Sequence, residues 1–238
     1  LAQELQIKPS QADAAVKLID EGNTIPFIAR YRKEATGSLN DEVLRQLYER
    51  LNYLRSLEEK KQQVLSSIEE QGKLTDELKA QIEAAQTLVV VDDLYRPYRP
   101  KRRTRATIAK EKGLEPLANL IRLQLTKKTL EEEAQSFLNA EKEVTTTEDA
   151  ISGACDIIAE AISDEADYRI RIREMTAKKG MILSSAKDPK KDSVYEMYYE
   201  FSEGVSKIAG HRILALNRGE SEKILTVKVE APQEDIIR

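Results

Sequence analysis

Apolar residues recur at spacings of three and four along most of the chain, which is the spacing of helices that bury one face. The clearest example is a long helix that we predict from Ser38 or Asn40 to about Gln71. One seam of this segment carries Leu44, Leu47, Leu51 and Leu54. Gly72 ends the helix, and Thr75 is positioned to cap the next one. The pattern therefore predicts a long intramolecular αα-hairpin.

Shorter helical patterns precede this hairpin. Ser10, followed three residues later by Asp13, predicts a helix start of the capping-box type. Thr24 and Pro26 predict a second start directly afterwards. With a helical stretch at 2–7, these segments predict a compact three-helix unit. A helix-turn-helix and simple helix packing both account for such a unit.

The middle of the chain also favours helix. The β-branched run at 88–91 fits a strand or a buried helix, and we favour a helix because the acidic pair Asp92 and Asp93 follows it. An amphipathic stretch also precedes this run. Shorter helices are predicted near residues 103–112, 114–124 and 129–138.

A longer helical run is predicted from Thr147 toward Gly180. One face of it carries Ile151, Cys155, Ile158 and Ile162, and Gly153 allows a neighbour to approach closely. Residues 184–193 have the composition of an exposed loop. The only clean strand pattern is the alternation at 225–230. Because a single strand cannot satisfy its own backbone, we expect it to pair with a strand elsewhere in the chain.

These elements predict a mainly α fold, an elongated array of helices with a small β element near the C-terminus. The expected divisions are a helix-turn-helix-like unit at 1–38, the long αα-hairpin at 39–96, a helical body at 97–183 and a helix and strand segment at 194–238.

Composition agrees with a helix-rich protein. Charged residues make up 34% of the chain, aromatic residues only 5%, and there is no Trp. The single cysteine, Cys155, cannot form an internal disulfide, and we expect it to be a small core residue. No apolar run approaches the ~20 residues of a membrane span, and no signal peptide opens the chain, so we expect a cytoplasmic protein. Because the chain starts at Leu1 without Met and stops at Arg238 with no closing element, we expect it to be part of something longer.

Positive charge is concentrated in residues 96–112, called here the basic segment. It holds eight Lys or Arg against the single acid Glu111, a local charge of +7 in a chain of net charge -4. Tyr95 and Tyr98 lie among these cations, and Pro97 and Pro100 favour an extended backbone. A cationic island attracts polyanions within about a Debye length, ~8 to 10 Å.

Phosphate contacts beside planar side chains are typical of nucleic-acid binding. The candidate phosphate-contacting residues are Arg96, Arg99, Lys101, Arg102, Arg103 and Arg105. The alternative is that these side chains pair with surplus carboxylates and fasten one helix to the next.

The sequence gives little support for a catalytic function. The only histidine, His211, has no second histidine with which to form a metal site and no acid partner at a suitable spacing. No glycine-rich phosphate loop or dinucleotide fingerprint is present. Asp92 and Asp93 could hold Mg²⁺, but paired acids beside cations more often form ion pairs. We therefore expect a binding protein, not an enzyme, with no metal or cofactor.

Two stretches resemble a known family. They are the segment TIPFIARYRKEATGSL at 24–39 and the segment DLYRPYRPKRRTRATIA at 93–109. Both closely resemble the N-terminal region of the bacterial Tex family of transcription accessory proteins. Phe201-Ser202-Glu203 and the stretch from His211 to Glu220 resemble the part of that family that precedes its next domain. The resemblance runs from about Ile7 to Val229.

The resemblance implies a helical protein that binds RNA or DNA and associates with the transcription or translation machinery. It also implies that a ribonuclease-H-like domain, helix-hairpin-helix elements and an S1 domain follow in the family. Two functions are therefore expected as alternatives. One is nucleic-acid binding through the basic segment. The other is a scaffold that positions those further domains and binds a protein partner, RNA polymerase or the ribosome. Within the first stretch we expect Arg30 and Glu34 to form a structural ion pair.

Overall fold

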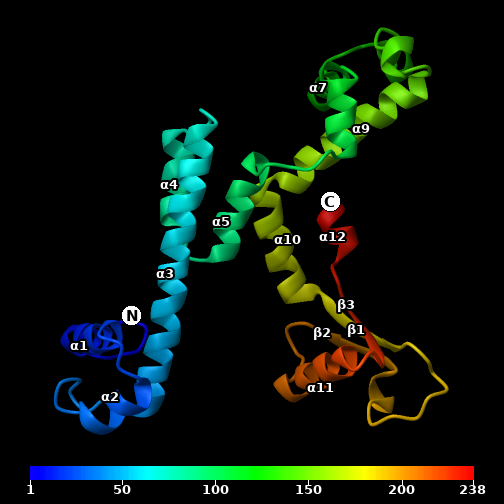
Figure 1. The fold of residues 1–238 in the computed structure, drawn as a ribbon. Helices are drawn as coiled ribbons and strands as arrows, with labels where there is room; N and C mark the ends of the chain where they lie inside the picture. Colours follow the sequence, from blue (N-terminus) through cyan, green and yellow to red (C-terminus); the bar gives the residue numbers. More distant parts are fainter. The chain divides into compact units, whose positions relative to one another are not determined.

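The computed structural model describes residues 1–238, and helices dominate it. It contains twelve α-helices and one three-stranded antiparallel sheet, which confirms the mainly α fold. The chain forms two compact units, Leu1–Tyr95 and Arg96–Arg238 (Figure 1). No helix combines the length and the apolar character that a membrane span requires.

The first unit is built around one long helix. Its elements are α1 (Pro9–Asp20), α2 (Ile25–Tyr31), α3 (Asp41–Glu70), α4 (Asp76–Ala84) and α5 (Leu88–Tyr95). The helices α1, α2, α4 and α5 all pack against α3. Figure 1 shows α4 alongside one part of α3, with α1 and α2 near its other end. The run at 88–91 is helical, as predicted.

The predicted αα-hairpin is confirmed, and its ends follow from local capping. The Asn40 side chain accepts a hydrogen bond from the Val43 backbone N–H at 2.8 Å, and Thr75 accepts one from Leu78. The α3 seam buries Leu44, Leu47, Leu51, Leu57, Val64, Leu65 and Ile68, so Leu57 takes the place expected for Leu54. Lys61 is also buried, and its Nζ donates to the Glu83 carbonyl oxygen at 2.7 Å. This bond satisfies a backbone carbonyl at the C-terminal end of α4.

The N-terminal prediction was partly wrong. Helix α1 begins at Pro9, and the Lys8 N–H donates to the Gln11 side chain at 3.0 Å, so Ser10 lies inside the first turn and does not cap it. Proline is favoured at the first helical position, which explains the shift. Residues 2–6 form turns, and the Ile7 N–H is bonded to the Ala2 carbonyl at 3.0 Å. The start of this unit therefore contains two helices, not three.

The second unit begins with a helical part. Its elements are a 3₁₀ turn (Arg96–Tyr98), α6 (Arg105–Glu111), α7 (Glu115–Leu123), α8 (Leu130–Gln135), α9 (Thr147–Asp164) and α10 (Ala166–Lys179). The helices α6, α7 and α8 all pack against α9. The predicted long run ending near Gly180 is interrupted at Glu165, whose backbone is extended (φ -67°, ψ 117°).

The buried face of α9 matches the predicted one only in part. Ile151 and Ile158 pack against the core as predicted, but Cys155 is exposed and Ile162 is 53% exposed. The buried positions are Ala150, Ala154 and Ile157. The small alanine side chains allow α6 to pack closely against α9. The position of the largest apolar residues therefore does not show which face of α9 is buried. The close approach at Gly153 is confirmed, because a Cβ there would lie 2.4 Å from Leu114 Cδ1.

A small sheet follows α10. Its strands are β1 (Met181–Ala186), β2 (Glu200–Gly204) and β3 (Leu225–Glu230), in the order β2-β1-β3. Strand β3 is confirmed, and its partner is β1, with Met181 opposite Glu230. The expected loop at 184–193 was therefore wrong at its start, since Ser184 and Ser185 belong to the central strand. Helix α11 (Gly210–Ser221) packs on β3, and α12 (Gln233–Ile237) ends the chain.

Candidate nucleic-acid interface

The basic segment is mounted on α9. After the 3₁₀ turn, residues 99–104 have no regular structure, and Thr104 then caps α6 by accepting a hydrogen bond from the Thr107 N–H at 3.1 Å. Ala106 and Ala109 are buried in the core that α6 shares with α9. Both ends of the irregular stretch are therefore tied to the same helical body.

Two of the six candidate cations anchor the stretch. The Arg96 Nε donates to Asp164 Oδ1 at 2.9 Å, and the Lys101 Nζ contacts both Asp164 and Glu160, the latter at 3.2 Å. Asp164 is only 10% exposed. Partial burial lowers the pKa of Lys101, but hydrogen bonds to Asp164 and Glu160 outweigh this effect and raise it above its ordinary value. Lys101 therefore stays charged at neutral pH, and these two side chains serve as clamps.

Two further cations make exposed ion pairs. The Arg103 Nη2 lies 3.1 Å from Glu111, and the Arg105 Nε lies 3.7 Å from Asp156. The arginine side chains are 70% and 86% exposed. Exposed pairs of this kind contribute only about 0 to 1 kcal/mol, so a phosphate can replace the carboxylate at little cost.

The last two candidates, Arg99 and Arg102, have no carboxylate within ion-pair distance and are exposed. They lie on either side of the clamped Lys101 in the irregular stretch. The structure thus separates residues that looked alike in the sequence into two clamps, two exposed paired arginines and two unpaired arginines.

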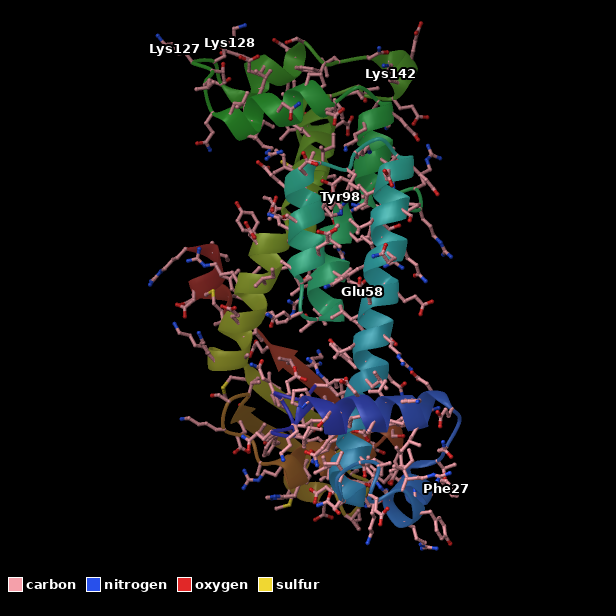
Figure 2. The ribbon with its side chains drawn as sticks, turned by 90° about the vertical axis from the view of Figure 1, so that its left-hand side faces the viewer. Phe27, Glu58, Tyr98, Lys127, Lys128 and Lys142 are labelled. Carbon is pink, nitrogen blue, oxygen red and sulfur yellow. The ribbon has the colours of Figure 1, made fainter.

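The tyrosines of this region are less open than the sequence suggested. Tyr95 is partly buried in the first unit, where its Oη lies 3.0 Å from the Ser67 Oγ. Tyr98, labelled in Figure 2, is also partly buried and already has an interaction partner. Neither ring offers a fully exposed face for base stacking.

A groove lies between the basic segment, α7 and α9. It contains the cations Lys101, Lys110 and Arg122, but also the acids Glu115, Glu160, Asp164 and Glu165. Its charge is therefore mixed. Arg99, Arg102 and Arg103 do not line it, so the free positive charge lies on the irregular stretch and not in the groove.

Other candidate residues lie elsewhere. Asp92 pairs with Lys60 at 3.1 Å and Asp93 is 3% exposed, and no group of three metal-ligating side chains gathers anywhere in the chain. His211 is exposed on α11. The expected pair of Arg30 with Glu34 does not form. The reason is that α2 ends at Tyr31, so the two side chains are not one helical turn apart.

Sequence reasoning missed the carboxylates that hold the clamps. Glu160 and Asp164 are four positions apart on α9, so both lie on one side of that helix. This spacing was visible in the sequence, but nothing local connected it with cations in a distant part of the chain.

Comparison with known proteins places the chain in a family. Residues 1–69 match the Tex-like protein N-terminal domain, and residues 126–237 match the Tex central region. The chain belongs to the Tex family. The basic segment of this Tex chain lies between the two matched regions.

Relatives agree with this assignment. The chain is 47% identical to the uncharacterised protein YdcI of Bacillus subtilis, over 99% of this chain and 33% of that protein. It is 44% identical to the transcriptional accessory protein Tex of Neisseria gonorrhoeae, over 99% of this chain and 31% of that protein. It is 31% identical to the human S1 RNA-binding domain-containing protein 1, over 96% of this chain and 24% of that protein. The chain thus spans about a third of the bacterial relatives it matches.

Proposed function

We propose that this chain is a helical nucleic-acid-binding module of a transcription accessory protein, and that the stretch 99–105 contacts RNA or DNA phosphates. The Neisseria relative carries the name transcriptional accessory protein, and the human relative is named for an RNA-binding domain. These names support the class of function. The residues proposed here rest on the geometry of this chain, and no catalytic role is part of the proposal.

One observation carries the proposal: Arg99 and Arg102 are exposed and unpaired beside a clamped Lys101. An arginine without a carboxylate partner gives up no ion pair when it binds a phosphate. The clamps also hold the backbone, so less conformational entropy is lost on binding. Arg103 and Arg105 add two exposed guanidinium groups that hold only surface pairs.

The clamps also favour a second candidate function. Arg96 and Lys101 bind the carboxylates at the end of α9 and fasten the start of the unit to its long helix. A segment used in this way has a structural role. The module would then position other regions of a longer Tex protein and bind RNA polymerase or the ribosome.

Salt-dependent binding distinguishes the two functions. We expect the double variant Arg99→Gln, Arg102→Gln to bind labelled single-stranded RNA or DNA more weakly than the wild type. The loss of two phosphate contacts should also reduce the steepness of log affinity against log salt, lowering the magnitude of the slope by roughly 1.4 to 1.8. The measurement is a fluorescence anisotropy titration at several salt concentrations.

The matched control is Lys127→Gln, Lys128→Gln. These two cations are also exposed, belong to the same unit and have no ion pair, and Figure 2 shows both projecting outward. The control makes the same change in net charge and should leave the slope almost unaltered. Equal slopes for both double variants would reject the phosphate-contacting stretch and leave the scaffold function.

A further inference from the structure

The first unit carries an exposed aromatic pair that has no part in the proposed function. Phe27 and Tyr31 are four positions apart on α2, so they share one face. Their ring centroids lie 5.3 Å apart. Tyr31 is 64% exposed and Phe27 is 37% exposed. Figure 2 shows Phe27 projecting outward at the edge of the unit, whereas the opposite side of α2 is packed, since Ile28 is fully buried.

Three cations lie close to this pair in the sequence and have no acid partners. Arg30, Arg32 and Lys33 are exposed, and none of them lies within ion-pair distance of a carboxylate. The Arg32 guanidinium lies 5.7 Å from the centre of the Phe27 ring. This distance is that of a cation–π contact. Phe27 therefore contacts both Arg32 and Tyr31, whereas the Tyr31 side chain remains 64% exposed.

The backbone after α2 is held in place. The buried Thr36 Oγ1 bonds to the Arg32 carbonyl at 3.3 Å, and the Gln11 side chain donates to the Thr36 and Gly37 carbonyls at 3.2 and 2.9 Å. Gly37 has φ +59°, and a Cβ there would lie 2.8 Å from Gln11 Nε2. The turn that follows α2 and Arg32 is therefore fastened to α1.

Helix stability alone explains only part of this arrangement. Cations near the end of α2 interact favourably with its C-terminal carbonyls. That interaction gives no reason for two aromatic rings to face solvent, since rings contribute most to stability when buried. Exposed rings beside unpaired cations are the combination on which single-stranded nucleic acids bind, with bases on the rings and phosphates on the cations.

We infer that Tyr31 is a base-stacking platform for single-stranded nucleic acid, with Phe27 as its positioning residue and Arg30, Arg32 and Lys33 as phosphate contacts. A duplex is excluded as the ligand because its bases are already stacked on each other. The unpaired positive charge favours a polyanion over an uncharged protein surface. This site is separate from the stretch 99–105 and does not depend on it.

The test uses the whole chain in the Arg99→Gln, Arg102→Gln background, where the basic segment contributes least. The probe is a fluorescent single-stranded DNA of about ten thymidines, a length within the usual range for such sites. We expect Tyr31→Leu to weaken binding by about 5- to 150-fold, the usual effect of losing one stacked base. Tyr31→Phe keeps the ring and should bind as the parent does.

The matched control is Tyr168→Leu, which removes an exposed tyrosine (52% exposed) outside the aromatic pair. It should leave affinity unchanged. A 5-iodouracil-substituted probe should also photo-crosslink to the peptide that contains Tyr31, in both the wild type and the double variant.

Any of three outcomes would overturn the inference: no binding by the Arg99→Gln, Arg102→Gln variant, unchanged affinity for Tyr31→Leu, or crosslinks confined to residues 96–105. The last of them would leave the proposed function intact. Loss of a captured protein in Tyr31→Leu, with unchanged oligonucleotide binding, would instead assign this face to protein docking.

Discussion

At the scale of single residues, identical side chains acquire different roles from what they meet. Arg96 and Arg99 are three positions apart, yet Arg96 donates to a nearly buried carboxylate and Arg99 has no partner. The deciding residue, Asp164, lies 68 positions from Arg96. Because Asp164 accepts from both Arg96 and Lys101, it holds the whole stretch that we propose to contact phosphate.

Removing this carboxylate's charge should loosen the stretch. We expect Asp164→Asn to lower the free energy of unfolding by about 1.5 to 3 kcal/mol, the usual contribution of hydrogen bonds to charged groups. Urea unfolding followed by circular dichroism gives the value. The control is Asp192→Asn, the same change in an exposed loop residue without an ion pair. Equal stability of the two variants would show that the clamp contributes nothing.

At the scale of elements, side-chain caps explain many helix starts. Asn40, Thr75, Thr104, Thr129 and Thr146 each accept a hydrogen bond from the backbone N–H three positions later. In α9 the cap is reciprocal, because Asp149 accepts in turn from the Thr146 N–H at 3.2 Å. Hydrogen bonds from Thr146, and then from Thr145, lower the pKa of Asp149 below its ordinary value of 3.8.

This lowered pKa predicts a pH dependence for the capping box. A carboxylate with a depressed pKa stabilises the fold fully above its unfolded pKa, and this stability is lost as the pH falls through the folded value. We therefore expect Asp149→Asn to lower the melting temperature near neutral pH, and the difference from wild type to shrink below pH 3.8. Thermal melts at a series of pH values measure it.

The control for this experiment is Asp13→Asn, because Asp13 is an exposed carboxylate in α1 that accepts no hydrogen bond. It should change the melting temperature less at neutral pH. If the difference in melting temperature between Asp149→Asn and the wild type stays constant as the pH falls below 3.8, the charge of Asp149 has no part in the cap.

At the scale of the whole molecule, each unit closes its own cores. One core in the first unit joins Ala12, Ala15, Ile28, Leu39, Leu44 and Leu47. In the second unit, one core lies around α9 and another, with Tyr195, Tyr198, Leu216 and Leu225, lies between α11 and the sheet. None of these three clusters takes residues from both units.

Residues 1–95 should therefore fold alone. We expect this fragment to be helical and to melt cooperatively, as judged by far-UV circular dichroism. Leu44→Ala in the fragment should destabilise it by about 2 to 5 kcal/mol, because Leu44 is fully buried in its core. A gradual melt that this variant does not alter would show that the first unit needs the second.

Much of the local structure could be predicted from the sequence. The αα-hairpin, the helix at 88–95 and strand β3 follow from apolar spacing, caps and alternation, all of which act within a few residues. The position of the basic segment was equally plain. Predictions failed where neighbours compete or a partner is distant: Pro9 starts α1 ahead of Ser10, and Ser184 enters a strand because β3 lies beside it.

The sequence by itself determined that the chain is helical, where most helices begin, and where positive charge is concentrated, because these properties depend on adjacent residues. Tertiary structure alone decided which face of α9 is buried, which strands pair and which arginines remain unpaired. These outcomes depend on contacts between residues far apart in the chain, such as Lys101 with Asp164. Arg99, Arg102 and the exposed ring of Tyr31 could be identified as candidate contacts only from the folded structure, because it shows which neighbouring side chains are already paired.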